Sequence, residues 1–478
     1  MSKRWGNTIY SLLEQTGPFA TADTPPGFRV FSTESRQRAK CLREKELVTK
    51  YRATRNQIFE FLDVSSFSEI QGLLKDKERR LQIERRAYKL LGNMFGIHGS
   101  EREIITRVDS YSRTADDVIR YLKNKILANY APFIEITNEI DITSSPVELL
   151  LIMFDGRYHK KARFEAKRKL ILMSLAGSID QRERETEVEA KFAGFLDFLN
   201  AFVWSPEIKI GELDIFYLLS SHRKIDFSCK DVQVLDMDEA AKIKPKSGQK
   251  LTLIKRRRFK ENGREIPIYV SVRKKPPEAK VLKLMRKNEE NPAIAVDDEL
   301  GLLGVLDTVA EVRLYQKHLT ESAIRANSFM TLEDISNSLR GGRHKSSSIG
   351  SSSSTPMLKF FARMGGMRVE FIVHTNKSYL DYIYKKDVSH DEYEVKRIFD
   401  SGVAELLFPR EIYHLDMAAV KKRLDTLVQT EDRKLLEELF PECCQHIFIF
   451  TRHPAEYFYC LALCTCKEFY ADGKQFFV

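Results

Sequence analysis

Apolar positions in the first third of the chain recur with the period of an α-helix. Between residues 35 and 130 the pattern predicts charged amphipathic helices, among them 75–91 and 114–128. Gly92-Asn93 is a pair of residues that commonly stands at a helix C-terminus, so we expect the first of these helices to end there. This part of the chain is predicted to be entirely helical.

The pattern from residue 132 to about 250 is mixed. Apolar stretches at 147–154 and 188–202 have helical character, whereas 224–235 has the alternation of a strand. No motif accompanies these segments. They indicate an α/β region without assigning it a role.

A β-hairpin is predicted next. Its strands are 251–259 and 266–272, and they turn at Glu261-Asn262-Gly263, where Asn-Gly supplies the positive φ angles of a tight turn. In the second strand the apolar residues fall on even positions through Val272, so Arg273 and Lys275 share the opposite face.

Two prolines then lead from this strand into a predicted helix over 278–287. On this helix Lys280, Lys283 and Lys287 lie on one side, and Val281, Leu284 and Met285 lie on the other, as a buried stripe would. A strand that ends in R-x-K and hands over to a lysine-bearing helix is how a protein builds a cationic pocket for a polyphosphate. The alternative is an edge strand and a helix whose lysines are solvated.

Two acidic residues stand in apolar surroundings further along. Residues 293–306 read as an apolar strand with Asp298 near its start, and 307–320 read as a helix. Residues 368–375 read as a strand in which Glu370 shares a face with Ile372 and His374. An unpaired buried carboxylate is costly, so we expect each to meet a cation or a metal ion. The alternative for Glu370 is an edge position that faces water.

These patterns predict an α+β protein: an N-terminal all-α region, a central mixed β-sheet domain with flanking helices, and a C-terminal β-rich piece. The predicted boundaries are 1–130 for the helical domain, 131–250 for the mixed region, 251–410 for the sheet domain, and 411–478 for a C-terminal helix with a β-meander.

Composition is that of a globular protein, with 43% hydrophobic and 31% charged residues over 478 positions. The net charge of +10 favours anionic partners, and the run 255–258 (Lys-Arg-Arg-Arg) favours an RNA or ribosome contact. No signal peptide or membrane-spanning run is recognisable, so we expect a cytoplasmic protein without membrane partners. Five of the seven cysteines lie from Cys443 onward in apolar surroundings, and we interpret them as buried strand residues without a metal.

The order of the motifs resembles the RelA/SpoT family of guanosine polyphosphate synthetases over roughly residues 270–397. The matching segments, in chain order, are Val272-Arg273-x-Lys275, Ala279-x3-Lys283, Asp298-x-x-Gly301, Val369-Glu370-x-Ile372-x-His374-Thr375 and His390-x-x-Tyr393. The resemblance implies a nucleotidyltransferase-like fold for the central domain. It also implies an Mg²⁺-dependent pyrophosphokinase, which moves the β,γ-diphosphate of ATP to the 3′-hydroxyl of a guanine nucleotide or of a tRNA end.

The same resemblance assigns roles to individual residues. Arg273, Lys275 and Lys283 would bind ATP phosphates, while Asp298 and Glu370 would be the catalytic carboxylates and would bind Mg²⁺. The remaining candidates would line the cleft on the acceptor side: His374, His390, Tyr393, Arg340 and Arg343. Asp298 and Glu370 can share a metal ion only if their strands are neighbours.

The sequence also departs from the family pattern. Leu303 stands where the strand has an arginine, Ala279 replaces a serine, and the loop around Arg343 has no clear counterpart of the family's guanine-stacking tyrosine. These departures favour a second function: a synthetase-like module that binds nucleotide or RNA without turnover. Retention of Asp298 and Glu370 favours the enzyme.

Overall fold

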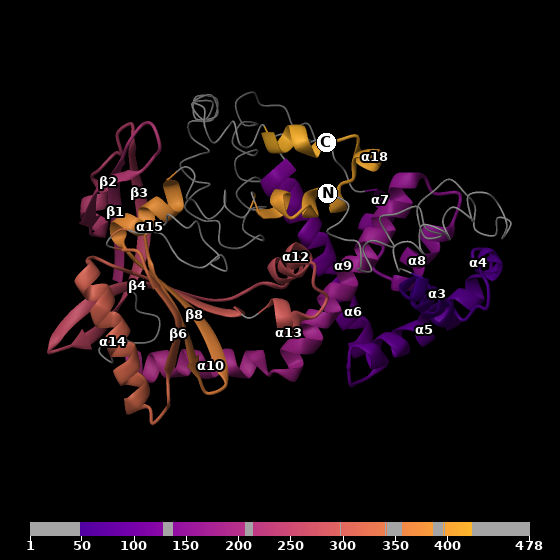
Figure 1. Ribbon diagram of the computed structural model, residues 1–478, viewed down its shortest axis with the longest axis horizontal. Coiled ribbons are helices and arrows are strands. Elements are labelled where there is room, and N and C mark those ends of the chain that lie inside the picture. The colour runs from indigo at the N-terminus through magenta and orange to yellow at the C-terminus, as the bar shows by residue number, and fades with distance from the viewer. Residues whose placement is uncertain are drawn as a thin grey trace, which may run out of the picture.

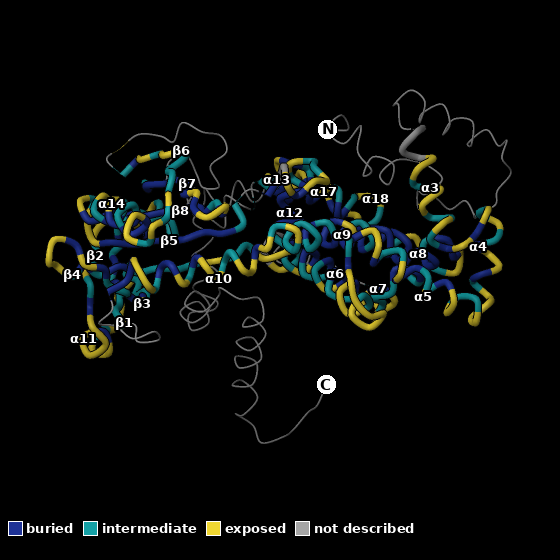
Figure 2. Tube along the Cα trace, turned by 90° about the horizontal axis from the view of Figure 1, so that it is seen from below, coloured by how far each residue is buried: buried dark blue, intermediate teal, exposed yellow. Residues whose placement is uncertain are grey.

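The computed structural model describes residues 48–127, 137–205, 214–296, 298–339, 341, 356–385, 395 and 397–422 (Figure 1). A helical part lies beside a part built on one eight-stranded mixed sheet, and α10 runs between them. Figure 2 shows buried segments running through both parts. The predicted α+β class is confirmed.

The helical part contains most of the N-terminal elements. They are α3 (Val48–Leu62), α4 (Phe67–Leu73), α5 (Lys77–Met94), α6 (Glu101–Leu122), the π-helical turn η2 (Lys123–Leu127), α7 (Asn138–Asp141), α8 (Pro146–Phe154) and α9 (Lys160–Glu185). The next two elements, α10 (Val188–Phe198) and η3 (Leu199–Val203), pack against the sheet.

Helix α6 shows how the sequence sets these elements. Ser100 accepts a hydrogen bond from the Glu103 backbone N–H while Glu103 accepts one from the Ser100 N–H, a reciprocal cap that fixes the start of the helix. Its apolar positions recur at helical spacing and are buried against α9, which forms the central helix of this part.

The sheet has the order β2-β1-β3-β4-β5-β8-β7-β6. Its strands are β1 (Asp214–His222), β2 (Cys229–Leu235), β3 (Gln249–Glu261), β4 (Arg264–Lys274), β5 (Leu300–Leu306), β6 (Thr331–Asn337), β7 (Leu358–Met364) and β8 (Met367–Thr375). The helices of this part are α11 (Met237–Ala241), α14 (Val309–Arg325) and α15 (Asn376–Tyr384). Four more helices from the second half of the chain pack in the helical part: α12 (Pro277–Lys287), α13 (Pro292–Ala295), α17 (Val403–Leu407) and α18 (Arg410–Tyr413). β5 pairs antiparallel with β4 and parallel with β8.

The two faces of the sheet are covered differently. One face packs against α10, η3 and α14, and its core includes Val369, Phe371 and Val373 of β8. The other face is covered by α15 over β1, β3 and β5. Toward the start of β5 and β8 this second face carries charged residues, beyond the apolar cluster that α15 makes.

The predicted hairpin is confirmed. β3 and β4 meet at Asn262 and Gly263, whose φ angles are 52° and 75°. Strand β4 then leads into α12, whose apolar side is buried together with residues of α6 and α9. Because α12 belongs to the helical core while β4 belongs to the sheet, the corner between them lies where the two parts of the protein meet (Figure 1).

Two details of the predicted elements are wrong. The predicted strand 293–306 begins only at Leu300, because Asn291 caps a short helix through its Oδ1, which accepts a hydrogen bond from the Ala293 N–H at 2.9 Å. Helix α5 continues past Gly92-Asn93 to Met94. A Cβ at Gly92 would lie 2.9 Å from Ile104 Cδ1, so this glycine permits close packing of α5 against α6 instead of ending a helix.

The predicted boundaries do not coincide with the layers of the fold. β1 and β2, from the region 131–250, belong to the same sheet as the strands that follow. Residues of 411–422 pack into the core of the helical part. The rest of the predicted C-terminal piece, including the β-meander and its cysteines, lies outside the described residues. None of the described helices is long and apolar enough to cross a membrane.

Candidate functional site

A row of residues crosses the charged end of the second sheet face. Arg273 on β4 is paired with Gly301 on β5, and Gly301 is paired with Glu370 on β8. Gly301 has no side chain, so the Arg273 side chain lies across it: a Cβ at Gly301 would be 3.4 Å from Arg273 Nε and 3.6 Å from the Glu370 carbonyl oxygen. Arg273 thereby reaches Glu370, with Nη2 at 3.7 Å from Oε2.

Glu370 is buried, with 7% of its side chain exposed, and it faces away from the apolar core of the sheet. Its Oε1 lies 2.7 Å from Nζ of Lys359, which is itself buried on β7. The carboxylate is therefore compensated on two sides, by Lys359 and by the half-exposed Arg273. This is the cationic partner that a carboxylate in an apolar strand requires.

Asp298 lies two residues before β5 and is clamped by two lysines. Lys275, directly after β4, places Nζ 2.6 Å from Asp298 Oδ2, and Lys283 on α12 places Nζ 2.7 Å from Oδ1. Burial works against the charged carboxylate, but the two ammonium groups outweigh it and hold the pKa of Asp298 well below its usual range. Burial lowers the pKa of Lys275, although Asp298 opposes this effect.

The sequence predicted Arg273, Lys275, Lys283, Asp298 and Glu370 as one site, and the structure brings all five to the same corner of the sheet. Asp298 and Glu370 belong to neighbouring segments, because β5 and β8 are paired. Among the described residues of this cluster, four cations, including Lys359, face two carboxylates, which leaves an excess of two positive charges. We call these six residues the site cluster.

The structure places the other candidates differently. His374 shares the face of Glu370 but is wholly buried beneath α15, where its ring lies 5.2 Å from that of Tyr382 and Nδ1 is 3.1 Å from the Pro356 carbonyl oxygen. It therefore lies among packed side chains, away from the row of Arg273 and Glu370. His390, Tyr393, Arg340 and Arg343 lie outside the described residues.

Lys359 was missed by sequence reasoning. A signal for it exists, because it is the one cation within the buried run 357–362 and so requires a partner in the same way as Glu370 does.

The neighbouring Phe361, which is paired with Glu370 across β7 and β8, carries the Arg368 guanidinium over its ring at 3.5 Å. Glu333 and Asp334 of β6 hold that arginine in place.

A second group of charges lies on the other side of the same corner. Lys280 on α12 is wholly buried and pairs with Glu183 of α9 and with Glu299. Lys274 of β4 pairs with Glu183 and with Glu189 of α10. We call these five residues the corner cluster. It joins the helical part to the sheet, and among the described residues its three carboxylates exceed its two cations by one.

The donor atoms of the site cluster fit Mg²⁺ in type. Mg²⁺ prefers carboxylate oxygens and is commonly held by one or two carboxylates together with substrate phosphates, and Asp298 and Glu370 supply such oxygens. No three His, Cys, Asp or Glu side chains gather to hold a metal ion anywhere in the part of the chain that the structure describes. The residues thus suit an ion that arrives with a nucleotide better than one held by protein alone.

Comparisons with known proteins give no relative: no family model, curated protein or solved structure matches this chain. The function must therefore be argued from the geometry and charge of the site cluster.

Proposed function

We propose that the site cluster binds the triphosphate of ATP and that the protein transfers the β,γ-diphosphate to a 3′-hydroxyl of a guanine nucleotide or a tRNA end. The observation that carries the proposal is the excess of cations around two carboxylates, Glu370, which is buried on β8, and Asp298, which is mostly buried just before the neighbouring strand β5. Cations alone would suit any polyanion. Carboxylates set among them are what phosphoryl-transfer sites use to hold the metal ion of a nucleotide.

Each residue has a role in this proposal. Arg273 is half exposed, so its guanidinium is accessible to a phosphate, and Lys275 and Lys283 reach the same carboxylate from a strand end and from a helix. In the reaction a bond forms between the acceptor 3′ oxygen and the β-phosphorus of ATP, the α,β-anhydride bond breaks, and AMP leaves. The cations stabilise the negative charge that develops on the transferred group and on AMP.

Asp298 and Glu370 would hold Mg²⁺ once the phosphates have drawn the lysines away from them. When bound there, the ion would neutralise part of the negative charge that develops on the phosphates in the transition state. In the structure Lys275 and Lys283 occupy both Asp298 oxygens, so phosphate and carboxylate compete for the same ammonium groups.

This competition also favours a second function, a module that binds nucleotide or RNA without turnover. In such a module the lysines would keep their pairing with Asp298, and Leu303, which is paired with Ser271 and Ile372, would leave the centre of the sheet without a further cation. The two functions differ in whether the carboxylates are needed after nucleotide has bound.

The two functions are separated by an assay with γ-labelled ATP, Mg²⁺ and either GDP, GTP or bulk tRNA. If the protein is the enzyme, label should appear in the acceptor, and the rate of transfer should fall roughly 100-fold or more in Asp298→Asn and Glu370→Gln. ATP binding should persist in Asp298→Asn, because this change removes a negative charge from between two lysines. Asp231→Asn, on the exposed edge strand β2, is the matched control. ATP binding without transfer to any of the three acceptors would establish the binding module instead.

A further inference from the structure

The row of residues that crosses the sheet continues beyond Glu370. Its partner on β7 is Phe361, and the partner of Phe361 on β6 is Glu333, so with Arg273 and Gly301 the row spans five strands. Paired residues on neighbouring strands lie roughly 5 Å apart and point to the same face of the sheet. One end of the row therefore carries a cation proposed to bind phosphate, and the other end carries an aromatic ring and a carboxylate.

Arg368 stacks on the ring of Phe361. Its guanidinium carbon lies 3.5 Å from the ring centroid, which is the contact distance of two stacked planes. Arg368 comes two residues before Glu370 on β8 and so shares its face. Lys359, which pairs with Glu370, also lies over this ring, with Nζ 5.4 Å from the centroid. The stack of arginine and phenylalanine is therefore continuous with the site cluster.

Two carboxylates of β6 hold the guanidinium in place. Glu333 Oε2 accepts a hydrogen bond from Arg368 Nε at 3.1 Å, and Asp334 Oδ2 accepts one from Nη2 at 2.9 Å. Asp334 lies in a bulge, because the pairing of β6 with β7 shifts between Glu333 and Ser336 and the φ angle of Asp334 is 51°. A residue other than glycine adopts this left-handed conformation at a cost, and bulges that re-aim a side chain are frequent beside active sites.

A guanidinium fixed on an aromatic ring is a surface on which a nucleobase can stack. The Arg368 side chain is 18% exposed and the Phe361 residue only 9%, so the guanidinium is the more accessible layer of the stack. Among the described residues the charges here balance: Arg368 and Arg363 pair with Glu333 and Asp334. A neutral ring therefore fits this surface better than a further phosphate does.

The exposed carboxylate beside the stack selects among the bases. Asp334 is 71% exposed, and Arg368 engages its Oδ2, so Oδ1 can accept a hydrogen bond from a ligand. Guanine presents two adjacent donors on its Watson–Crick edge, N1–H and the 2-amino group, whereas adenine presents one donor beside an acceptor. We propose that Arg368, stacked on Phe361, binds a guanine base and that Asp334 accepts hydrogen bonds from the edge of this base.

This inference rests on the proposed function, because it assigns the base of the acceptor nucleotide whose 3′-hydroxyl reacts at the site cluster. It favours a guanine nucleotide over a tRNA end as the acceptor. The base lies one to two strand spacings from Glu370, roughly 5–10 Å, which leaves room for the ribose between them. The acceptor then approaches from β7 and β6, while the cations of β4 and α12 hold ATP on the other side of Glu370.

Isothermal titration calorimetry of the full chain measures this binding without any transfer. The probes are GDP, IDP, which lacks the 2-amino group, and inorganic pyrophosphate, which lacks the base. We expect GDP to bind about tenfold more tightly than pyrophosphate, because stacking of the base adds to the phosphate contacts. GDP should also bind threefold or more tightly than IDP, since one hydrogen bond to a carboxylate is lost, an effect of roughly that size or larger.

Two variants test the residues. Arg368→Met leaves Glu333 paired with Arg363 and Asp334 solvated, so the fold should persist, as circular dichroism can confirm. It should weaken GDP binding about tenfold and leave the affinities for pyrophosphate and ATP unchanged. Asp334→Asn should remove the preference for GDP over IDP.

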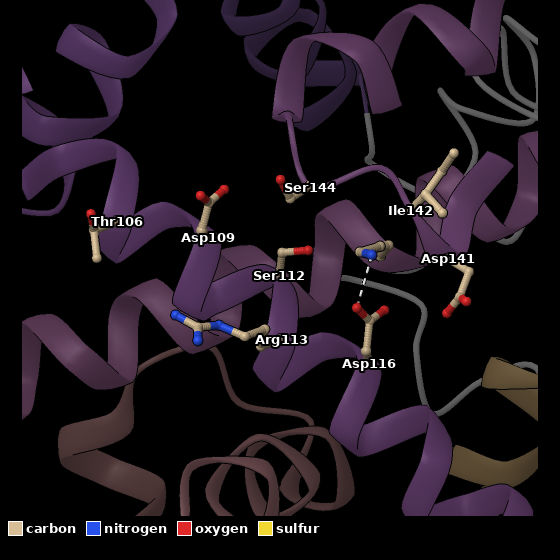
Figure 3. Close-up of a pocket in the computed structure, with 9 residues that line it drawn as sticks. Thr106, Asp109, Ser112, Arg113, Asp116, Asp141, Ile142 and Ser144 are labelled. Atoms are coloured by element: carbon tan, nitrogen blue, oxygen red, sulfur yellow. Dashed lines mark hydrogen bonds and ion pairs between the residues drawn. The ribbon is translucent and has the colours of Figure 1, made fainter. Parts of the chain in front are cut away.

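Each variant has a matched control in the helical part. Arg55 also lies over an aromatic ring, that of Phe59 at 5.9 Å, so Arg55→Met is the control for Arg368→Met. Asp109 lines a pocket on α6 far along the chain from the sheet (Figure 3), and Asp109→Asn is the control for Asp334→Asn. Both controls should bind GDP as the unchanged protein does.

Equal affinities for GDP and pyrophosphate would overturn the proposal, and so would an advantage of GDP that persists in Arg368→Met. An equal loss of ATP and GDP affinity in Arg368→Met would overturn the assignment to guanine. Failure of the proposed function gives a different result: γ-labelled ATP would leave no label in GDP, although GDP would still bind in a manner that depends on Arg368.

Discussion

The corner cluster and the site cluster share the same short stretch of chain, but their net charges have opposite signs. Lys274 and Lys280 go to the corner cluster, where carboxylates are in excess, while Arg273, Lys275 and Lys283 go to the site cluster, where cations are in excess. Alternation along β4 and the turn of α12 separate them. A cluster with surplus carboxylates holds its lysines in place, whereas one with surplus cations attracts a further anion.

The comparison also shows why burial of a lysine alone does not indicate function. Lys280 is more deeply buried than Lys283, yet its partners come from α9 and from the segment before β5, so it connects the two parts of the protein. What distinguishes the two clusters is their net charge. In a cluster with more cations than carboxylates the cations repel one another, and an added anion relieves this repulsion.

The largest expected effect is a difference in the free energy of unfolding between variants of Lys280 and of Lys283. Lys280→Met removes the wholly buried cation that compensates the mostly buried Glu183 and Glu299, and we expect it to lower the free energy of unfolding by about 3–5 kcal/mol. Lys283→Met removes one of the surplus cations and leaves Asp298 paired with Lys275, so the loss should be much smaller. Urea denaturation measures both.

For ATP affinity we expect the opposite order, with the larger effect in Lys283→Met and the smaller in Lys280→Met. We expect Lys283→Met to weaken ATP binding by roughly tenfold or more, because a charge-assisted contact to phosphate is lost. The folded fraction of Lys280→Met should bind ATP nearly as the unchanged protein does. Equal destabilisation by both substitutions, with unchanged ATP affinity in both, would remove the distinction between the clusters.

Local patterns of the sequence were enough to predict part of this arrangement. The alternation in β4 and β8 places Arg273 and Glu370 on the face opposite the apolar core. That Asp298 joins them was implied only by the resemblance of the motif order to a known family. These predictions depend on residues two or four positions apart. Alternation within a strand therefore predicts which face each side chain lies on, but not which strands are its neighbours.

What the sequence could not give is the choice of distant partners. Lys280 and Lys283 were predicted on one side of α12, yet Lys280 pairs with Glu183, which lies 97 positions away, and Lys283 pairs with Asp298. Helix α9 was not predicted, because five of the eight consecutive buried residues 162–169 are charged and the stretch lacks an apolar stripe. Buried ion pairs and hydrogen bonds replace that stripe; for example, Arg168 Nη1 donates to Tyr413 Oη at 2.7 Å.

A third prediction concerns the loss of stability at acid pH. The pKa of Asp298 lies below its ordinary value of 3.8 in the folded protein, so as pH falls the unfolded chain takes up the proton first. The stability that Asp298 contributes is therefore present in full above its unfolded pKa and is lost as pH falls below about 4 toward the folded pKa. Urea denaturation between about pH 6 and pH 3 should show the stability difference between the unchanged protein and Asp298→Asn shrinking with acid.

A stability difference that stays constant over this range would mean that the lysine clamp does not stabilise the charged carboxylate. The excess of cations would then lie too far from Asp298, or be too well solvated, to act on it. The site cluster would in that case resemble an ordinary charged surface.

The smallest expected effect concerns Gly301, which lets Arg273 cross β5 to reach Glu370. A Cβ there would be 3.4 Å from Arg273 Nε, an ordinary contact distance, so Gly301→Ala should change the free energy of unfolding by less than about 1 kcal/mol and the ATP affinity by less than about threefold. Gly301→Val adds methyl groups in the path of the arginine and should weaken ATP binding as much as Arg273→Met does. The double variant Gly301→Val, Arg273→Met should then be no weaker than either single one, because both act on the same contact. Additive losses in this double-mutant cycle would show that Gly301 affects nucleotide binding by another route and that the row across β4, β5 and β8 does not act as a unit.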